Sequence, residues 1–117
     1  MKAILLISHG SRSVNTKKEV VELIVKLKVA KVADFIEYAF LELEEPSIPD
    51  GIDLCVRNGA KDIKILLNFL NSGRHVDQDI PRIILDARTK YPDVNIKITK
   101  PVGQHPGIVN LFLDLLN

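Results

Sequence analysis

Apolar and polar positions alternate along the chain in a way that predicts strands separated by helices. Four strands are predicted, and the first is a short apolar run rich in Ile and Leu, as is typical of a buried parallel strand. They span residues 3–8, 35–43, 63–68 and 94–99. The segments between and after them instead have the periodicity of helices.

The predicted helices, except the last, have charged residues on one face and apolar residues on the other. They cover residues 15–32, residues 49–58, a segment beginning near Asp79, and residues 107–116. Asp79 is a suitable N-cap, because Pro81 then lies in the first turn, where its missing N–H costs nothing. Strands alternating with helices predict an α/β fold. We expect a single three-layer, flavodoxin-like domain over residues 1–117, with a four-stranded parallel sheet and helices on both faces.

The last predicted helix is apolar on almost every side. Only Asn110, Asp114 and Asn117 interrupt it, whereas a helix that covers one face of a sheet normally has a wide polar face. The helix is either well buried in its own domain, or it packs with a second face on another subunit. A chain of 117 residues leaves little room for a second domain to complete a pocket, so we favour a homodimer.

Composition narrows the class of protein. The chain is 46% apolar and 26% charged, as in an ordinary globular domain. Its 16 Lys and Arg against 15 Asp and Glu, and the absence of Trp, do not suit a nucleic-acid-binding surface. One cysteine, Cys55, cannot form an intrachain disulfide or a thiolate cluster. The apolar run Ala3 to Ile7 is too short for a signal peptide or a membrane span, so we expect a cytoplasmic protein with no nucleic-acid and no membrane partner.

All three histidines lie in loops that follow predicted strands. Open parallel sheets bind ligands beyond the carboxyl ends of their strands, so these loops should meet at one edge. His9 and His75 each have Gly, Ser and Arg close by, and two imidazoles at this edge indicate metal binding or proton acceptance. His105 precedes Pro106, which favours a place at a helix N-terminus over a ligand role. For each histidine, a solvated loop residue without function is the alternative.

The neighbours of the two histidines favour an anionic ligand. Guanidinium groups, hydroxyls and helix N-termini all suit an anion, although solvated surface residues are the alternative. The side chains concerned are those of Ser11, Arg12, Ser72 and Arg74. Glu42 and Glu45 are the carboxylates of the loop after the second strand, and one of them could serve as a metal ligand or proton acceptor.

Several common catalytic motifs are missing. The chain contains no G-x-x-x-x-G-K-[ST] phosphate loop and no G-x-G-x-x-G dinucleotide motif. It also lacks the G-x-S-x-G nucleophile elbow of serine hydrolases. Ser-His-Gly stands after the first strand, where a receiver domain would carry acidic residues.

Four segments together resemble the class II tetrapyrrole chelatases, and most of all the short CbiX-type sirohydrochlorin chelatases. They are Ile-Ser-His-Gly-Ser-Arg at residues 7–12, Ala-Phe-Leu-Glu-Leu-Glu-Glu-Pro-Ser-Ile at 39–48, the run from Phe69 to Pro81, and Pro-Val-Gly-Gln-His-Pro at 101–106. The resemblance follows the chain from start to finish. The third strand departs from it, because Ile65 to Phe69 contains no proline where relatives often have one.

The resemblance implies insertion of a divalent metal into sirohydrochlorin on the way to cobalamin. Cobalt is the usual metal, and nickel or iron are the alternatives. The metal is a substrate, and no permanently bound cofactor is implied. Short members resemble one half of the longer chelatases and act as homodimers. By position, His9 and His75 match the metal-binding and proton-accepting histidines, and Glu42 matches a recurring acidic position. We expect the substrate to contact Gly10, Ser11, Arg12, Ser72, Gly73 and Arg74.

Two other functions fit the same residues. The chain could be a tetrapyrrole or metal carrier that binds sirohydrochlorin without turnover. It could also be an interaction domain in which the loop histidines are incidental.

Overall fold

The computed structural model describes residues 1–117 and contains one parallel sheet of four strands. The strands are β1 (Lys2–Ser8), β2 (Phe35–Phe40), β3 (Asp62–Leu67) and β4 (Asn95–Pro101). Their order in the sheet is β2-β1-β3-β4. The chain therefore adds β2 on one side of β1 and then β3 and β4 on the other. Open α/β sheets bind ligands beside such a reversal of strand order.

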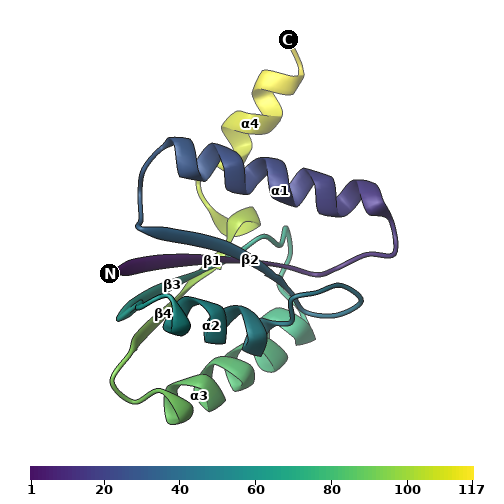
Figure 1. Ribbon diagram of the computed structural model, residues 1–117. Helices are drawn as coiled ribbons and strands as arrows, with labels where there is room; N and C mark the ends of the chain where they lie inside the picture. The colour runs from purple at the N-terminus through teal and green to yellow at the C-terminus, as the bar shows by residue number, and fades with distance from the viewer.

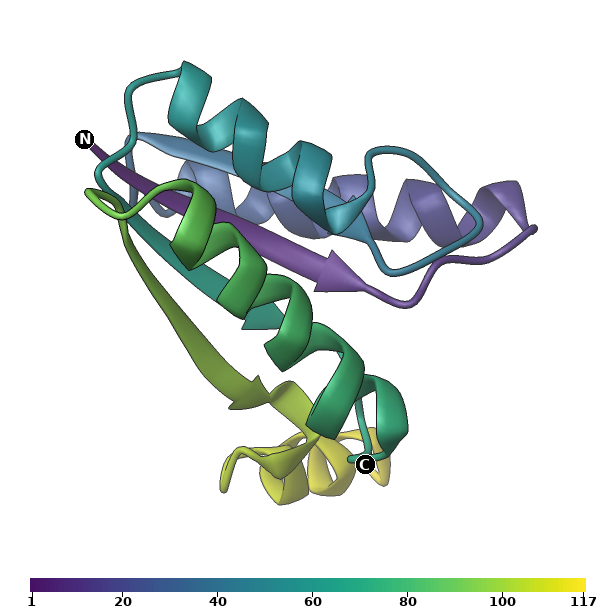
Figure 2. The same ribbon diagram turned by 90° about the horizontal axis from the view of Figure 1, so that it is seen from below.

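Four helices and two short helical turns connect and follow the strands. They are α1 (Val14–Val29), α2 (Ile48–Arg57), the π-helical turn η1 (His75–Asp79), α3 (Ile80–Lys90), the 3-10 turn η2 (Val102–Gln104) and α4 (Ile108–Leu115). Helices α2 and α3 cover one face of the sheet, and α1 covers the other (Figures 1 and 2). The predicted α/β architecture with helices on both faces is confirmed. None of the helices combines the length and the apolar character needed to cross a membrane.

The two faces of the sheet carry cores of very different size. On the α2 and α3 side, 16 buried residues form one cluster, which includes Leu5, Ile7 and Ile65. On the α1 side only five do, among them Leu6. Successive residues of a strand point to opposite faces. Strand β1 is apolar on both faces, whereas β3 and β4 place Lys64 and Lys97 on the α1 side.

Two predicted elements end earlier than expected, and backbone conformation explains both. Strand β2 stops at Phe40 rather than at residue 43, and Leu43 has a φ of 69°. Helix α1 stops at Val29 rather than at residue 32, and Lys31 has a φ of 54°. Neither an extended strand nor a right-handed helix continues through a residue in the left-handed region.

The prediction that Asp79 caps the N-terminus of α3 is wrong. Its backbone is already helical, with φ −68° and ψ −48°, and its side chain forms no cap hydrogen bond. The chain begins to turn at His75, because η1 runs directly into α3. Pro81 does lie in the first turn of α3, as predicted. The carboxylate of Asp79 is consequently available to another side chain.

The interpretation of the last helix as well buried in its own domain is also wrong. Helix α4 projects from the body of the molecule (Figure 1) and has no buried residue. Among the helices and strands, it has substantial contact only with η2. The other interpretation, that α4 packs against another subunit, stays a prediction.

Candidate metal centre

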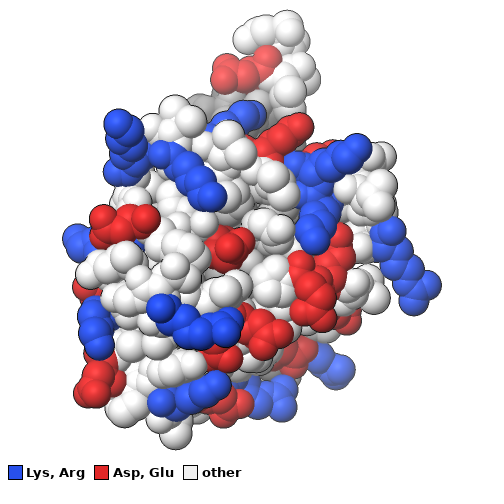
Figure 3. Space-filling model, viewed as in Figure 1, with Lys and Arg blue, Asp and Glu red and all other residues white.

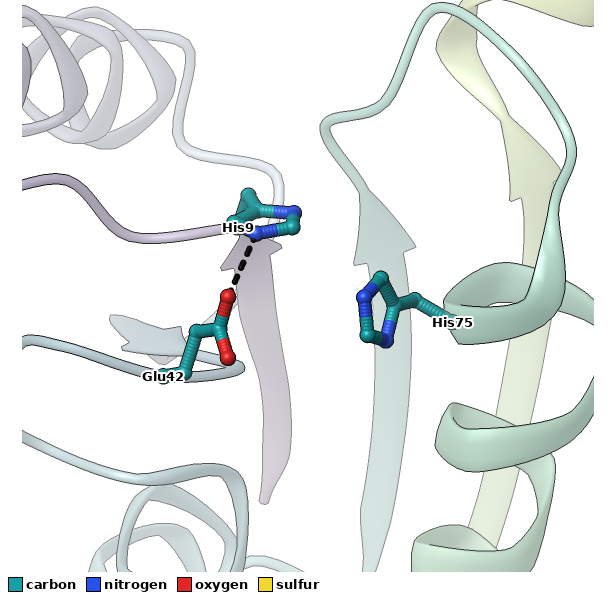
Figure 4. Close-up of side chains that lie close together, drawn as sticks. All are labelled: His9, Glu42 and His75. Atoms are coloured by element: carbon teal, nitrogen blue, oxygen red, sulfur yellow. Dashed lines mark hydrogen bonds and ion pairs between the residues drawn. The ribbon is translucent and has the colours of Figure 1, made fainter.

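Three loops at the carboxyl edge of the sheet bring His9, Glu42 and His75 together (Figure 4). His9 follows β1 directly, Glu42 lies just beyond β2, and His75 opens η1 after the loop from β3. The potential ligand atoms of the three side chains all lie within 4.8 Å of one another. Two imidazoles and one carboxylate could therefore hold a single metal ion.

His9 and Glu42 form a hydrogen-bonded pair. The distance from Nε2 of His9 to Oε1 of Glu42 is 2.7 Å, and the two side chains are 48% and 49% exposed. The backbone also joins the two loops, because the N–H of Glu42 donates to the carbonyl of His9 at 3.1 Å. The side chains of His9 and Glu42 are therefore close enough to bind the same ion, although they come from two different loops.

Gly10 makes this approach of the two loops possible. Its φ is 101°, and a Cβ built on it would lie 1.8 Å from the carbonyl oxygen of Glu42. Any other residue would separate the loops and be strained in this conformation. Gly10 is also an expected substrate contact, and the close approach of the two loops is a second reason for a glycine at this position.

His75 has a carboxylate partner of its own. Its Nδ1 lies 2.8 Å from Oδ2 of Asp79, four residues later, and Nη2 of Arg82 donates to the other oxygen of Asp79 at 3.1 Å. With Nδ1 engaged, Nε2 is the ring nitrogen left for a ligand. A carboxylate on the far nitrogen is the usual support of a metal-binding histidine, since it sets the ring orientation and raises ligand basicity. The His9 and His75 rings lie 5.2 Å apart in an edge-on arrangement.

The base of the site is held by hydrogen bonds between β1 and the loop after β3. The side-chain amide of Asn68 donates to the buried hydroxyl of Ser8 at 3.1 Å. The backbone N–H of Asn68 donates to the carbonyl of Ile7 at 2.8 Å. The ring of Phe69 lies edge-on to His9, with centroids 6.3 Å apart. These contacts tie the loop that leads to His75 to the strand that leads to His9.

The residues expected to contact an anion differ in their availability. Arg12 and Arg74 are exposed and form no ion pair. The Ser72 hydroxyl accepts a hydrogen bond from the side-chain amide of Gln104. The Ser11 hydroxyl accepts one from a backbone N–H two residues later. Gly73 is exposed and has open space around its Cα. Because both serine hydroxyls act as acceptors, their O–H groups can still donate to an anion. They are available to an anion together with the two guanidinium groups.

The remaining candidates lie outside the cluster. Nδ1 of His105 accepts the backbone N–H of Gly107 at 2.9 Å, just before α4, which agrees with the expected place at a helix N-terminus. Glu45 is not part of the ligand group. The neighbouring Glu44 accepts the backbone N–H of Ser11 at 3.1 Å and so holds the first loop in place.

Sequence reasoning missed two residues of the site, Asp79 and Gln104. The spacing of Asp79 from His75 was a usable signal, because residues four apart share one side of a helical turn. The sequence around Asp79 also fits the start of a helix, and that alternative hides the pairing with His75. Gln104 had no comparable signal, since its contact with Ser72 joins loops 32 residues apart.

Cys55 takes no part in the site. It lies in α2 and is fully buried. Burial raises the pKa of its thiol to about 12. The thiol therefore stays protonated near neutral pH, and only a thiolate is an effective metal ligand or nucleophile.

Comparison with known proteins supplies the family. A model of the CbiX family matches residues 3–117. The chain belongs to the CbiX family. The resemblance seen in the sequence motifs is thereby confirmed.

The names of the proteins and solved structures similar to this chain mention different metals. The chain is 37% identical over 114 residues to the chloroplastic sirohydrochlorin ferrochelatase of Arabidopsis thaliana, covering 97% of this chain and 49% of that protein. It is 36% identical to the sirohydrochlorin cobaltochelatase of Methanocaldococcus jannaschii, covering 97% of this chain and 96% of that protein. The crystal structure of the sirohydrochlorin chelatase SirB from Bacillus subtilis subspecies spizizenii, in complex with cobalt, has a TM-score of 0.89 at 33% identity and covers 98% of this chain and 49% of SirB. The chain thus spans about half the length of two of these proteins and nearly all of the third.

Proposed function

We propose that this CbiX-family chain is a sirohydrochlorin chelatase that inserts a divalent metal ion, with cobalt preferred, and works as a homodimer. The observation that carries the proposal is the cluster of His9, Glu42 and His75 at the edge of the sheet. Family membership alone would be compatible with a carrier. A cluster with both metal ligands and proton acceptors on an open surface favours turnover.

The cluster suits a metal ion that must arrive and leave. Two imidazoles and one carboxylate are suitable ligands for Co²⁺, Ni²⁺ and Fe²⁺ alike. The three side chains are 46–49% exposed, so an incoming ion can exchange its water for them. Three protein ligands leave open coordination positions, which the nitrogens of the macrocycle can take.

Metal insertion also requires proton acceptors. Each divalent ion that enters the macrocycle replaces two pyrrole protons. The unprotonated imidazoles of His9 and His75 can each accept one of these protons once the ion has passed from them to the macrocycle. The carboxylate of Glu42, hydrogen-bonded to His9, can stabilise the imidazolium that results.

The free guanidinium groups suit the rim of the macrocycle. Sirohydrochlorin carries carboxylates around its edge, and Arg binds carboxylates in bidentate geometry. Arg12 and Arg74 lie in the loops that carry His9 and His75. They can therefore hold the rim while the face of the ring lies over the metal ligands. A second copy of the chain would close the exposed side of this arrangement.

The preference for cobalt rests on a relative that matches this chain in length. The Methanocaldococcus jannaschii protein, which the chain covers almost completely, is named a cobaltochelatase. The ligand set does not separate cobalt from nickel or iron. The rates of insertion of cobalt, nickel and iron must therefore be compared directly.

The decisive experiment is to mix the protein anaerobically with sirohydrochlorin and Co²⁺, Ni²⁺ or Fe²⁺ in turn and to follow absorbance. We expect insertion above the uncatalysed rate, and fastest with Co²⁺. Binding of the macrocycle without acceleration for any metal would replace the proposal with a carrier function. Equal acceleration by all three metals would retain the chelatase and remove the cobalt preference.

A further inference from the structure

The face of the sheet covered by α1 is left half open. A groove with a volume of about 640 Å³ runs between α1 and the segment that follows β4. We refer to it as the α1 groove. Its apolar lining includes Leu6, Leu66, Leu23, Leu27, Val102 and Pro106. The opposite face has two helices, α2 and α3, whereas this face has only one (Figure 2). Parallel sheets are normally covered on both faces, so the groove occupies the place of a missing helix.

The same chain carries an apolar helix with nothing to cover it. Helix α4 extends past α1 and away from the sheet (Figure 1), and this projecting part is almost free of charged side chains (Figure 3). Six large apolar residues at this end of the chain are more than half exposed, namely Val109, Leu111, Phe112, Leu113, Leu115 and Leu116. A helix that is apolar on all sides is stable only when it is buried. A surface patch of this kind marks an interaction site.

We propose that α4 of one copy of the chain docks in the α1 groove of a second copy, and that the second copy returns its own α4 to the groove of the first. This exchange names the surface by which the proposed homodimer forms, and it rests on that pairing but not on metal insertion. A reciprocal exchange is a closed two-fold arrangement, because each copy donates and receives the same element.

Charge and area both support a second copy as the occupant. The one charged residue lining the groove is Lys100, and the one charged residue in α4 is Asp114, so the two surfaces have opposite signs. Two exchanged helices with six large apolar side chains each bring the buried surface to the order of 1,000 Å² or more, where specific interfaces begin. A molecule without a long apolar helix would leave α4 itself exposed.

The test uses one variant of the groove and one of the helix. Leu23→Arg puts a charge at the groove while leaving α4 intact, and Phe112→Asp puts a charge on α4 while leaving the groove intact. Leu23 is 41% exposed and Phe112 is 57% exposed, so neither replacement puts a charge in the buried core. Val25→Arg is the matched control, because Val25 lies on α1, is 54% exposed and does not line the groove.

Sedimentation equilibrium across the micromolar range should show a dimer for the unmodified chain and for Val25→Arg. Each of the two test variants should weaken self-association by about tenfold or more. An equimolar mixture of the two should associate more strongly than either alone, because one intact helix then meets one intact groove. Thermal unfolding by circular dichroism checks that each variant is folded. If Leu23→Arg does not fold, Val102→Asp takes its place as the groove variant. If Phe112→Asp does not fold, Leu111→Asp takes its place as the helix variant.

Any of the following results would overturn the proposed exchange of α4 between two copies. A monomeric unmodified chain would show that α4 does not join two copies. A dimer that survives Leu23→Arg would indicate pairing of α4 with α4, and one that survives Phe112→Asp would indicate pairing of the two grooves. No association in the mixture would indicate that α4 folds into the groove of its own chain. None of these measurements uses metal or macrocycle, so a failure of the chelatase proposal would be seen separately.

Discussion

His9 and His75 lie at the same edge of the sheet, yet the chain supports them in different ways. His9 is in an open loop, and its Nε2 hydrogen bonds to Glu42, another member of the cluster. His75 is on a helical turn, and its Nδ1 hydrogen bonds to Asp79, which lies outside the cluster. In the first pair, Nε2 of His9 and Oε1 of Glu42 can bind one ion only by giving up their hydrogen bond to each other. The second can stay as it is, because Nε2 is already free.

This difference indicates a division of labour between the two sides of the site. Asp79 holds the ring of His75 in place in the absence of metal, which would lower the free-energy cost of metal binding in the proposed function. In the proposed reaction, Glu42 and His9 would give up their hydrogen bond to each other for bonds to the metal or to a proton. The side of His75 should therefore be the fixed part of the site, and the side of His9 the part that responds to substrate.

The largest effect should come from removing both histidines. In His9→Ala/His75→Ala we expect the rate of metal insertion to fall by about 100-fold or more, because ligands and proton acceptors are lost together. Absorbance of sirohydrochlorin measures the rate, and circular dichroism checks the fold. A fully active double variant would refute the assignment of the site.

Glu42→Gln should have the next largest effect. The amide keeps the size of the side chain but loses the charge that favours a divalent ion, so we expect about 30-fold weaker Co²⁺ binding. Titration with Co²⁺, followed by the visible absorption of the ion, measures the affinity. Glu45→Gln is the matched control in the same loop and should bind Co²⁺ as the unmodified chain does. Equal affinities for both variants would show that Glu42 is not a ligand.

Asp79→Asn tests whether His75 depends on its own carboxylate. We expect about tenfold weaker Co²⁺ binding, since a neutral amide orients the imidazole less firmly and does not raise its basicity. Asp79→Glu should recover part of the affinity if it can still reach Nδ1. An Asp79→Asn variant as tight as the unmodified chain would mean that the His75 side is no more preorganised than the His9 side.

The smallest effect on the site should come from Asp53→Asn, which removes a carboxylate far from both histidines. Burial raises the pKa of Asp53, but hydrogen bonds from Tyr91 and Lys90 outweigh it, so its pKa lies below the usual value. We expect unchanged metal binding and a Tm lower by a few degrees.

The pH dependence of that Tm difference follows from the direction of the shift. A carboxyl with a lowered pKa in the folded state adds stability above its unfolded pKa, near 3.8. That stability is lost as the pH falls through the lower folded value. The difference in Tm between the unmodified chain and Asp53→Asn should therefore be present near neutral pH and shrink below about pH 4. A constant difference down to pH 2 would show that the carboxylate acts through its shape and not its charge.

Much of the site could be predicted because parallel sheets collect their loops at one edge. His9, Glu42 and His75 each follow a predicted strand, so locating the strands was enough to bring the three loops together. The choice of Glu42 over Glu45 could not be made from strand positions, because both lie in the same loop. It depends on the backbone contact at Gly10, which only the folded chain forms.

The amino-acid sequence by itself determined the order of strands and helices and the edge at which the histidines meet. These follow from local periodicity and from the rule that parallel strands align their carboxyl ends. Only the tertiary structure decided that Asp79 supports His75, that Glu42 reaches His9, and that α4 stands away from the sheet. Each of these depends on the direction in which a side chain or helix leaves the backbone. That direction is set by contacts between segments distant in the chain, or by a local turn such as η1 that hydrophobic periodicity does not reveal.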